Sequence, residues 1–471
     1  MTRTQKMTLA VVCAATAMLM LDIAVVNTAL SRIAEDLGAD VSGLQWVVDA
    51  YTLALATVVL TAGSLADRFG RKRLFQGGLA LFTVSSVACA VAGDITFLNV
   101  ARAVQGVGAA VMFATSLSLL AAAFAVEERA KAFAAYGAVI GASFAFGPLV
   151  GGALTSGLDW QWVFLINVPV GAVCLWLTAR HVVESRDPAA PKVDVPGQVA
   201  LTGGLFLLVL GLLRGNEDGW TSTPIVLELG GAALFLVAFV AIEQRVAQPM
   251  LPLRLFRDRD FSGAQIAAYA ISASFFAIFL YTTLYLQQVL GLSAIEAGLV
   301  YMPATLLNFV VAGMSVQLGA RVSPRVMIGG GLGLVALGMA MLTGAGTDSS
   351  WTALLPGMVV AMIGTGMFNP ALANLAVGAV PVEQSGLASG VNDTFRQAGI
   401  AVGVAALGAL IPTADLFSGG DPQAYVDGMN EAMWAGAALA AVGAVAAFAL
   451  IRWKAPIAEP VAAREPALAT A

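Results

Sequence analysis

The chain has 471 residues, of which 59% are hydrophobic and only 11% are charged, and its formal net charge is −5. Charged residues are therefore about half as frequent as in soluble globular domains. This composition excludes an ordinary soluble protein, and the small negative charge gives no indication of nucleic-acid binding.

Long apolar stretches follow one another along almost the whole chain. Each reaches about 20 residues, which is enough to cross a hydrocarbon core of about 30 Å as a helix. Backbone amides in lipid must bond within their own segment, so helices are expected. The predicted fold class is an all-α polytopic membrane protein with 14 transmembrane helices, at residues 8–30, 44–65, 74–93, 97–122, 132–155, 161–181, 197–213, 223–242, 262–290, 294–317, 326–345, 351–378, 388–411 and 431–452.

Basic residues predict the orientation. Of the 24 Lys and Arg, nearly all lie on the side of the N-terminus, which the positive-inside rule assigns to the cytoplasm. An even number of spans places both termini there. The preponderance of Arg over Lys, with abundant Ala, Gly and Val, is typical of a high-GC bacterium, so we expect a multi-pass protein of a bacterial cytoplasmic membrane. The exceptions are Arg32 and Arg214 in loops of the other side, and Arg102 and Arg396 within spans.

The first span contains LDIAVVNTAL and carries Asp22 in mid-membrane, with Asn27 toward the outside. It is too long for a signal peptide, so we expect it to be retained. An ionisable residue at this depth usually faces a cavity and is a functional candidate. Asp22 is predicted to exchange protons, although a purely structural ion pair is the alternative.

The second span opens with QWVVDAY, which places Asp49 near its outer end. Trp46 and Tyr51 are consistent with an aromatic belt at the interface. Asp49 has two interpretations that the sequence leaves equal. It attracts cationic substrate, or it is simply solvated at the interface.

The stretch GSLADRFGRKR, residues 63–73, is a charged turn between the second and third spans. Its glycines permit a tight turn, and its basic residues help to set the orientation. A helix N-terminus attracts a carboxylate, so Asp67 is expected to dock near residues 386–390 and latch the two halves of the protein. The predicted cytoplasmic gate loop comprises Gly63, Asp67, Arg68, Gly70 and Arg71.

The fourth span carries LNVARAVQGVGAA, with Arg102 inside the membrane. An unpaired arginine there would cost at least about 2.5–3.5 kcal/mol, so it needs a partner. Asp22 is the expected partner, with carbonyls of the first helix as alternatives. Gly106 and Gly108 permit the close helix contact that would bring the two together.

The fifth span reads GAVIGASFAFGPLVGG and is expected to be pliable and closely packed. Its proline lacks a backbone donor and its glycines lack side-chain bulk. Ordinary small-residue packing is the alternative, but the ordered cluster is more specific than that. The cluster comprises Gly147, Pro148, Gly151 and Gly152.

These pieces, in this order and spacing, resemble the major facilitator superfamily. GSLADRFGRKR is similar to the family's loop motif, LNVARAVQGVGAA to its arginine motif, and FGPLVGG to its antiporter motif, although Ser143 stands where the family has a leading glycine. LDIAVVNTAL, WQWVFLINVPVG, QPMLPLRLF, YLQQVLGLSAIEAGLVYMP and GLASGVNDTFRQAG resemble the fourteen-helix drug:proton antiporter family. The resemblance runs from Leu21 to about Arg452.

The resemblance implies two six-helix bundles with two helices inserted between them. The expected units are residues 1–181, a linker with inserted helices at 182–261, residues 262–452, and a disordered cytoplasmic tail at 453–471. Substrate would bind near the midplane between the bundles. In the inserted helices, Glu228 and Glu243 are interpreted as interfacial.

Polar and aromatic residues of the second bundle are predicted to line a substrate pathway. Interhelical hydrogen bonds are the alternative for most of them. Arg396 is the main charge of this bundle, and a local structural pair with Asp393 is favoured. The predicted pathway comprises Asn27, Trp46, Asp49, Tyr281, Tyr285, Asn308, Phe309, Asn369, Asn374, Asn392 and Arg396.

The predicted function is proton-coupled, secondary active export of small organic molecules, cationic or amphipathic, by a monomer. No GxxxxGK[ST] stretch is present, so ATP is not the direct energy source. The proton is the coupling ion, with Asp22 as the coupling acid and Arg102 tuning it; no other cofactor and no metal site are expected. The alternatives are an importer or a metabolite exporter of the same fold, or a non-transporting membrane sensor; the importer is less favoured because FGPLVGG resembles exporters. A membrane enzyme is least favoured, because no catalytic constellation is present.

Overall fold

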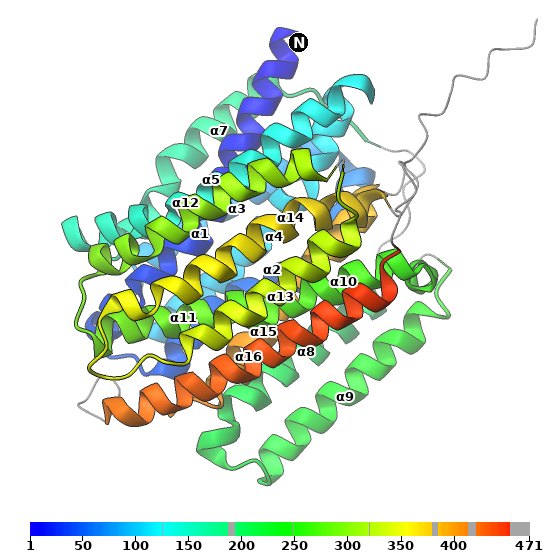
Figure 1. Cartoon of the computed structure of the whole chain (residues 1–471). Helices are drawn as coiled ribbons and strands as arrows, with labels where there is room; N and C mark the ends of the chain where they lie inside the picture. Colours follow the sequence, from blue (N-terminus) through cyan, green and yellow to red (C-terminus); the bar gives the residue numbers. More distant parts are fainter. Residues whose placement is uncertain are drawn as a thin grey trace, which may run out of the picture.

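The computed structural model describes residues 1–124, 126–186, 194–247, 249–319, 321–378, 385–412 and 421–452. Within these ranges the chain forms helices and no strands, and successive long helices run roughly antiparallel (Figure 1). The all-helical prediction is therefore confirmed for the described part of the chain. Every range predicted as a span contains helix.

The first helices, called here the N-terminal group, begin with a capping box between Thr2 and Gln5. The sixth predicted span is broken in two, because Pro169 has no N–H to donate to the carbonyl four residues before it. The group comprises α1 (Arg3–Leu37), α2 (Val41–Phe69), α3 (Arg71–Ala90), α4 (Ile95–Ala123), α5 (Val126–Gly157), α6 (Trp162–Leu165) and α7 (Asn167–His181).

The last helices, called here the C-terminal group, begin with a short 3-10 helix, followed by one long rod that two π-helical turns interrupt. Such turns were not predicted, since they leave no hydropathy signal. The group comprises η1 (Leu253–Arg257), α10 (Arg259–Ile271), η2 (Ser272–Phe276), α11 (Ala277–Leu284), η3 (Tyr285–Val289), α12 (Ala294–Leu318), α13 (Pro324–Leu342), η4 (Trp351–Ala353), α14 (Leu355–Gly378), α15 (Ser385–Gly408) and α16 (Pro422–Leu450).

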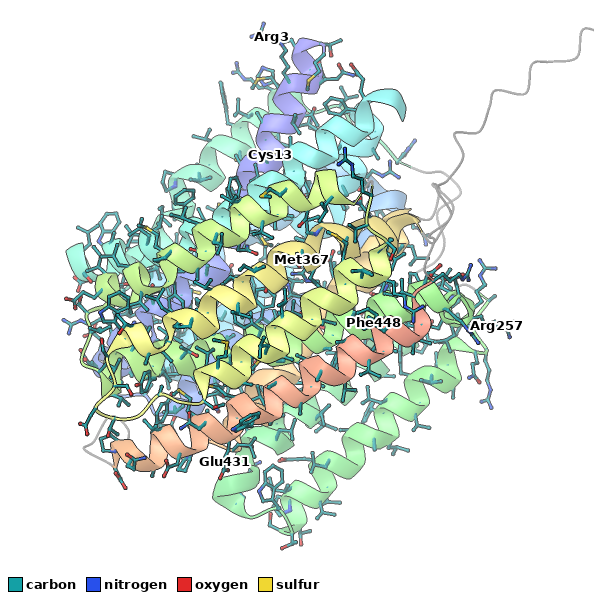
Figure 2. All side chains as sticks on the ribbon, viewed as in Figure 1. Arg3, Cys13, Arg257, Met367, Glu431 and Phe448 are labelled. Carbon is teal, nitrogen blue, oxygen red and sulfur yellow. The ribbon has the colours of Figure 1, made fainter. Side chains whose placement is uncertain are left out.

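Twelve helices of the described residues are long and apolar enough to cross a membrane. The other two long helices, α5 and α15, occupy predicted spans but are not among these twelve. We call the end of the molecule that holds the N-terminus and the α2–α3 turn the N-terminal end, and the other the opposite end. In Figure 2, Arg257 lies beside the last turn of α16, and Glu431 lies toward the other end of that helix.

Between the two groups lies a helical hairpin of α8 (Val195–Asp218) and α9 (Thr223–Glu243). Helix α8 packs against α2 and α15, while α9 packs on α8 at the periphery (Figure 1). Gln198 of α8 donates a hydrogen bond to the Thr57 carbonyl oxygen of α2 over 2.8 Å. Leu227 and Leu234 of α9 are each 69% exposed, as expected of a helix that faces lipid.

The hairpin shows the surroundings of its two acids, which the sequence analysis interpreted as interfacial. Glu243 is only 4% exposed, because the segment after α9 folds back and the Leu251 amide donates to its carboxylate over 2.9 Å. Glu228 accepts a 2.6 Å ionic hydrogen bond from Arg214. That arginine, placed in a loop by the sequence, lies in the last turns of α8.

Helix packing inside the N-terminal group depends on glycine. Association of helices in lipid relies on close contact of small residues, since lipid tails are as apolar as the side chains. A Cβ on Gly108 would lie 2.9 Å from the Gly78 carbonyl oxygen, and a Cβ on Gly106 would lie 2.4 Å from the Tyr51 carbonyl oxygen. These contacts hold α4 against α3 and α2.

Two adjacent glycines of α3 test this packing. A Cβ on Gly78 would lie 2.8 Å from Val111, whereas Gly77 has nothing within 4 Å. Gly78→Leu should lower the free energy of unfolding by about 1–3 kcal/mol, the usual cost of overpacking. Gly77→Leu should leave it nearly unchanged. Thermal unfolding of the two purified variants in the same detergent compares them, and equal losses would contradict the packing.

Candidate functional site

Asp22 and Arg102 meet inside the N-terminal group. An Arg102 Nη1 atom lies 2.6 Å from Asp22 Oδ2, and the two side chains are 2% and 0% exposed. Asp22 lies in the middle of α1 and Arg102 in the first half of α4. The structure thus brings together the two residues that the sequence paired, and the predicted alternative of helix 1 carbonyls is not used.

The guanidinium of Arg102 is held from several sides. Its Nε donates to the Val47 carbonyl oxygen over 3.0 Å, and its Cζ lies 4.2 Å from the centre of the Tyr51 ring. Val47 and Tyr51 are one helical turn apart on α2, so they form one face toward Arg102. The aromatic ring adds a cation–π attraction that grows when water is excluded.

Two amides complete the site, and the sequence analysis did not single them out. Gln105 Nε2 donates to Asp22 Oδ1 over 3.0 Å and to Ser86 Oγ over 2.9 Å. Asn167 Nδ2 donates to the same Asp22 oxygen over 2.8 Å. Gln105 stands one turn after Arg102 in the arginine motif, and that spacing was the available signal.

Asp22 therefore accepts hydrogen bonds from three donors on two other helices. Both oxygens of its carboxylate are thus hydrogen-bonded within the membrane. With Arg102 as counter-ion, the cluster holds a charged pair inside the membrane without an unpaired charge. We call Asp22, Ser86, Arg102, Gln105 and Asn167 the ion-pair cluster.

Asp49 has a different environment. It is 0% exposed, and neither carboxylate oxygen has a hydrogen-bond partner among the described residues. The interpretation of Asp49 as a solvated interfacial residue is therefore wrong. It lies two turns into α2, where the C-terminal group covers it.

The two groups meet closely at the opposite end. Gln45 Nε2 of α2 donates to the Tyr281 hydroxyl of α11 over 2.7 Å, and Gln287 Nε2 donates to the Thr28 carbonyl oxygen over 3.1 Å. The Ile295 amide of α12 donates to Ser156 Oγ of α5 over 3.1 Å. These bonds close the opposite end in this conformation.

The glycines of α5 form the second part of this closure. A Cβ on Gly147 would lie 2.3 Å from Ala24 Cβ, and one on Gly151 would lie 2.9 Å from Val25 Cα, both on α1. A Cβ on Gly152 would lie 2.5 Å from the Ala294 carbonyl oxygen of α12, and one on Gly298 would lie 2.4 Å from the Pro148 carbonyl oxygen. One face of α5 thus packs on α1 and another on the C-terminal group.

The predicted pathway residues do not form one lining in this conformation. The Tyr281 hydroxyl also donates to the Val404 carbonyl oxygen over 2.6 Å, and the Tyr285 hydroxyl donates to that of Gly346 over 2.7 Å. Asn392 donates to Gln265 Oε1 over 3.2 Å, and Asn27 donates to its own helix. These four serve interhelical or local hydrogen bonds, which was the predicted alternative.

The other pathway candidates are dispersed. Trp46 packs against Phe206 of α8, with ring centroids 5.9 Å apart. Asn308 and Asn369 are half-buried, each with its amide oxygen unpaired in the described residues, while Phe309 and Asn374 are exposed.

Arg396 lies with its Cζ 5.9 Å from the centre of the Phe276 ring. The described residues contain no salt bridge of 4.0 Å or less between Arg396 and Asp393, although the two interact electrostatically. The close local pair predicted for them is therefore absent from this conformation.

The α2–α3 turn is fixed by a residue that the sequence analysis did not single out. Gly70 adopts φ +111°, and Glu184, after α7, accepts hydrogen bonds from the Lys72 and Arg73 amides over 3.0 and 3.2 Å. A carboxylate at a helix N-terminus satisfies its free amides. The Arg71 backbone amide donates to the Ser185 carbonyl oxygen.

Two other residues of the predicted gate loop are less enclosed. Gly63 has open space around it, and Arg68 is exposed beside Phe69. The side chain of Asp67 lies outside the described part of the chain, so its predicted docking near residues 386–390, in the first turns of α15, stays a prediction.

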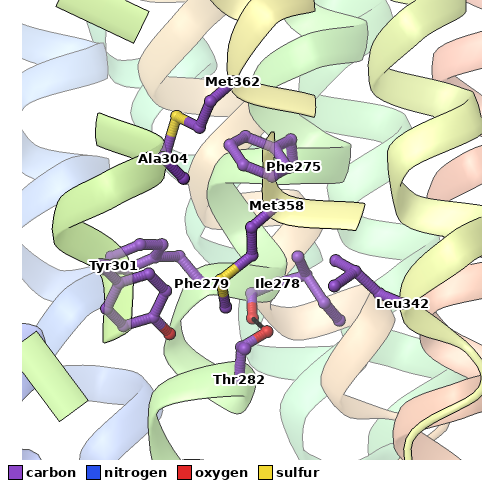
Figure 3. Close-up of a pocket in the computed structure, with 9 residues that line it drawn as sticks. All are labelled: Phe275, Ile278, Phe279, Thr282, Tyr301, Ala304, Leu342, Met358 and Met362. Atoms are coloured by element: carbon purple, nitrogen blue, oxygen red, sulfur yellow. Dashed lines mark hydrogen bonds between the residues drawn. The ribbon is translucent and has the colours of Figure 1, made fainter. Parts of the chain in front are cut away.

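A small apolar pocket lies within the C-terminal group (Figure 3). Phe275, Phe279, Tyr301, Met358 and Met362 line it, and the Phe279 and Tyr301 ring centroids are 4.3 Å apart. Its interior of about 10 Å³ has room for about one water molecule. It is too small for a drug-sized ligand, which needs about 300 Å³ or more.

Comparison with known proteins decides the family. The Major Facilitator Superfamily profile matches residues 12–404 and also residues 317–469. This chain belongs to the Major Facilitator Superfamily. The family consists of membrane transporters, not enzymes, so the chain is a multi-pass membrane protein with the all-helical fold of that family.

Relatives in actinobacteria extend over most of the chain. The multidrug resistance protein Stp of Mycobacterium tuberculosis is 35% identical over 87% of this chain and 76% of its own length. The cephamycin export protein CmcT of Amycolatopsis lactamdurans is 37% identical, covering 86% and 85%. The puromycin resistance protein pur8 of Streptomyces alboniger is 35% identical, covering 94% and 90%.

A solved structure agrees on the fold. The crystal structure of a peptide transporter POT in complex with sulfate superposes with a TM-score of 0.65 over 94% of this chain and 95% of that one. At 17% identity this likeness shows the fold alone.

A double-mutant cycle tests the ion-pair cluster. Removing one member of a buried pair leaves a charge unpaired and costs about 3–5 kcal/mol. Asp22→Asn and Arg102→Gln should therefore each lower the free energy of unfolding strongly, and the double variant should lose clearly less than the sum. Arg32→Gln, which breaks an exposed pair with Glu35, is the control and should cost at most about 1 kcal/mol. Additive losses at Asp22 and Arg102 would contradict direct pairing.

Proposed function

We propose that this chain exports small organic molecules, such as drugs or antibiotics, out of a bacterial cell in exchange for protons. The observation that carries the proposal is the ion-pair cluster in a member of this superfamily. A carboxylate buried in the membrane and held by an arginine is the kind of group whose protonation changes helix contacts. The relatives' names, which refer to resistance and export, support the substrate class and the direction.

The proposed fold has fourteen spans in two six-helix bundles. Helices α5 and α15 are 32 and 24 residues long and pack among the other spans, which supports counting them as well. The first bundle is residues 1–181, the linker with the inserted hairpin is 182–261, and the second bundle is 262–452. Residues 453–471 are proposed as a cytoplasmic tail.

We place the N-terminal end in the cytoplasm of a bacterial cytoplasmic membrane, with both termini inside and the protein acting as a monomer. The support is the distribution of basic residues. The opposite end then faces outward, and its closed contacts correspond to a conformation shut toward the outside.

The proposed cycle exchanges a proton for substrate at the ion-pair cluster. With Asp22 ionised, Arg102 holds α1 and α4 together. A proton arriving from outside would neutralise Asp22 and release Arg102 from its main electrostatic partner, which permits a different packing of these helices. Substrate must favour the unprotonated protein, because only a difference in affinity between states drives the cycle. Residues of the predicted pathway that change partners in the other state would contact the substrate.

Asp22→Asn tests the coupling acid. The amide keeps the side-chain shape but carries no exchangeable charge, so proton-linked efflux of ethidium from a pump-deficient host should fall to background. Glu35→Gln, at an exposed position near the end of the same helix, is the matched control and should retain wild-type efflux. Undiminished efflux by a normally expressed Asp22→Asn protein would contradict the assignment. A susceptibility panel in the same host would narrow the substrate.

Asp67→Ala tests the gate loop. If Asp67 latches the bundles in one state, its loss should leave the ethidium dissociation constant within about twofold and lower the efflux rate about tenfold or more. Arg68→Ala in the same turn provides a comparison for general loss of charge. A large change in the ethidium dissociation constant, together with an unchanged efflux rate at saturating ethidium, would argue against a latch.

A further inference from the structure

Asp49 is a second buried carboxylate of the N-terminal group, and its position differs from that of Asp22. It lies eight residues after the start of α2, about 12 Å from the opposite end at 1.5 Å per residue. Arg102 binds Asp22 and also contacts Val47 and Tyr51 of α2, so the two acids lie within the same turns of neighbouring helices. Asp22 is held inside the N-terminal group, whereas Asp49 lies near Tyr281 of the C-terminal group.

The two stripes of α2 have different neighbours. Val47 and Tyr51 face Arg102 of α4. Gln45, one turn before Asp49, crosses to Tyr281 of α11, and residues four apart share a face of a helix. The carboxyl of Asp49 lies near enough to Tyr281 to interact with it electrostatically. Asp49 thus belongs to the surface where the two groups close.

Among the described residues, no neighbouring group supplies a counter-charge or a donor to Asp49. Arg102 of α4 and Asp22 of α1 are engaged with each other. Tyr281 donates its proton to Val404.

The remaining ionisable groups lie elsewhere. Tyr51 of α2 lies against Arg102, and Asp393 and Arg396 of α15 form no salt bridge of 4.0 Å or less with Asp49 in the described residues. The described charges at α8 lie at its ends, since Asp194 is its N-cap and Arg214 and Asp218 lie in its last turns. Helix α3 carries its charges in its first turn.

An ionised carboxylate without a donor or a counter-charge is unstable in an apolar interior, where such groups take up a proton instead. We infer that Asp49 is a proton-binding site, loaded in this conformation, and that closure of the opposite end requires its proton. Opening that end separates α2 from α11 and returns the carboxyl to water, where it ionises. The proton of Asp49 thereby links the outside pH to the closing movement. The inference rests on the proposed proton-coupled cycle, and assigns to Asp49 a role distinct from the charged pair at Asp22.

The test measures the closing movement without substrate. Leu158, before α6, and Trp351, in η4, are exposed at the opposite end of the two groups. Cys13, Cys89 and Cys174 are first replaced by Ala. Spin labels at Leu158→Cys and Trp351→Cys then report the distance between the two groups at the opposite end, which increases when that end opens. Distances are measured in lipid nanodiscs from pH 5 to pH 10.

The parent should show the short, closed distance at low pH and lose it as the pH rises. For one linked proton the closed-to-open ratio falls about tenfold per pH unit above the midpoint. Asp49→Asn, which mimics the protonated acid, should keep the short distance at every pH. Asp49→Glu should restore a pH response. Asp393→Asn, another membrane acid, is the matched control and should behave like the parent.

Two outcomes overturn the inference: a parent distance that does not change with pH, or a parent-like response in Asp49→Asn. If Asp49→Asn responds like the parent and also loses ethidium binding, Asp49 is instead a recognition site for organic cations. If Asp49→Asn does not fold, Asp49→Ser removes the same titration and gives the same comparison. Proton-coupled ethidium transport by the parent is measured separately in proteoliposomes. Its absence would refute the proposed function, whereas an unaltered pH response in Asp49→Asn would refute only the role of Asp49.

Discussion

A guanidinium in the middle of a membrane helix can remain charged only where the protein supplies a counter-charge and the hydrogen-bond acceptors that water would otherwise provide. Arg102 meets this demand with a carboxylate of α1, a carbonyl oxygen and an aromatic ring of α2, and an amide of its own helix. Three helices are thereby fixed around one charge, and Asn167 adds α7 through Asp22. The glycine contacts of α4 with α2 and α3 are what let these groups come within bonding distance.

The two membrane acids of the N-terminal group are in opposite circumstances. Asp22 has three donors, one of them the cation Arg102, whereas Asp49 has no donor among the described residues. Both lie within the same few turns of neighbouring helices, but Asp22 is held inside one group and Asp49 lies where the two groups meet. A movement of one group against the other therefore changes the surroundings of Asp49 first. This asymmetry gives a physical reason for two carboxylates in a single exchange cycle.

The positions of the helices could be predicted because hydropathy over about 20 residues is a direct consequence of the lipid environment. The Asp22–Arg102 pair could be predicted because an intramembrane cation has few possible partners. Gln105 and Asn167 were not singled out, since polar amides are common in helices and only tertiary contact distinguishes those that bind a charge. Glu184 was missed for a similar reason, because it caps α3 from more than one hundred residues away.

The pathway prediction stays a prediction. Tyr281 and Tyr285 were expected to face a substrate, and in this conformation their hydroxyls bond to the carbonyl oxygens of Val404 in α15 and of Gly346 in the loop before η4. A polar residue inside an apolar run has the same sequence signature whether it lines a cavity or joins two helices. For Asp49, nearness to the end of a predicted span left solvation and attraction of cationic substrate equal, and only the structure shows that the side chain is buried.

Proton counterflow in proteoliposomes containing only the purified, unmodified chain tests the central claim most directly. The N-terminal end faces the outside of the vesicle, and the acidic lumen holds a trapped pH dye. Ethidium added outside should accumulate in the lumen while the lumenal pH rises faster than it does through passive proton leak. Collapsing the proton gradient with an ionophore should abolish the accumulation. Ethidium accumulation that proceeds with no change in lumenal pH, and that survives the ionophore, would contradict proton-coupled export.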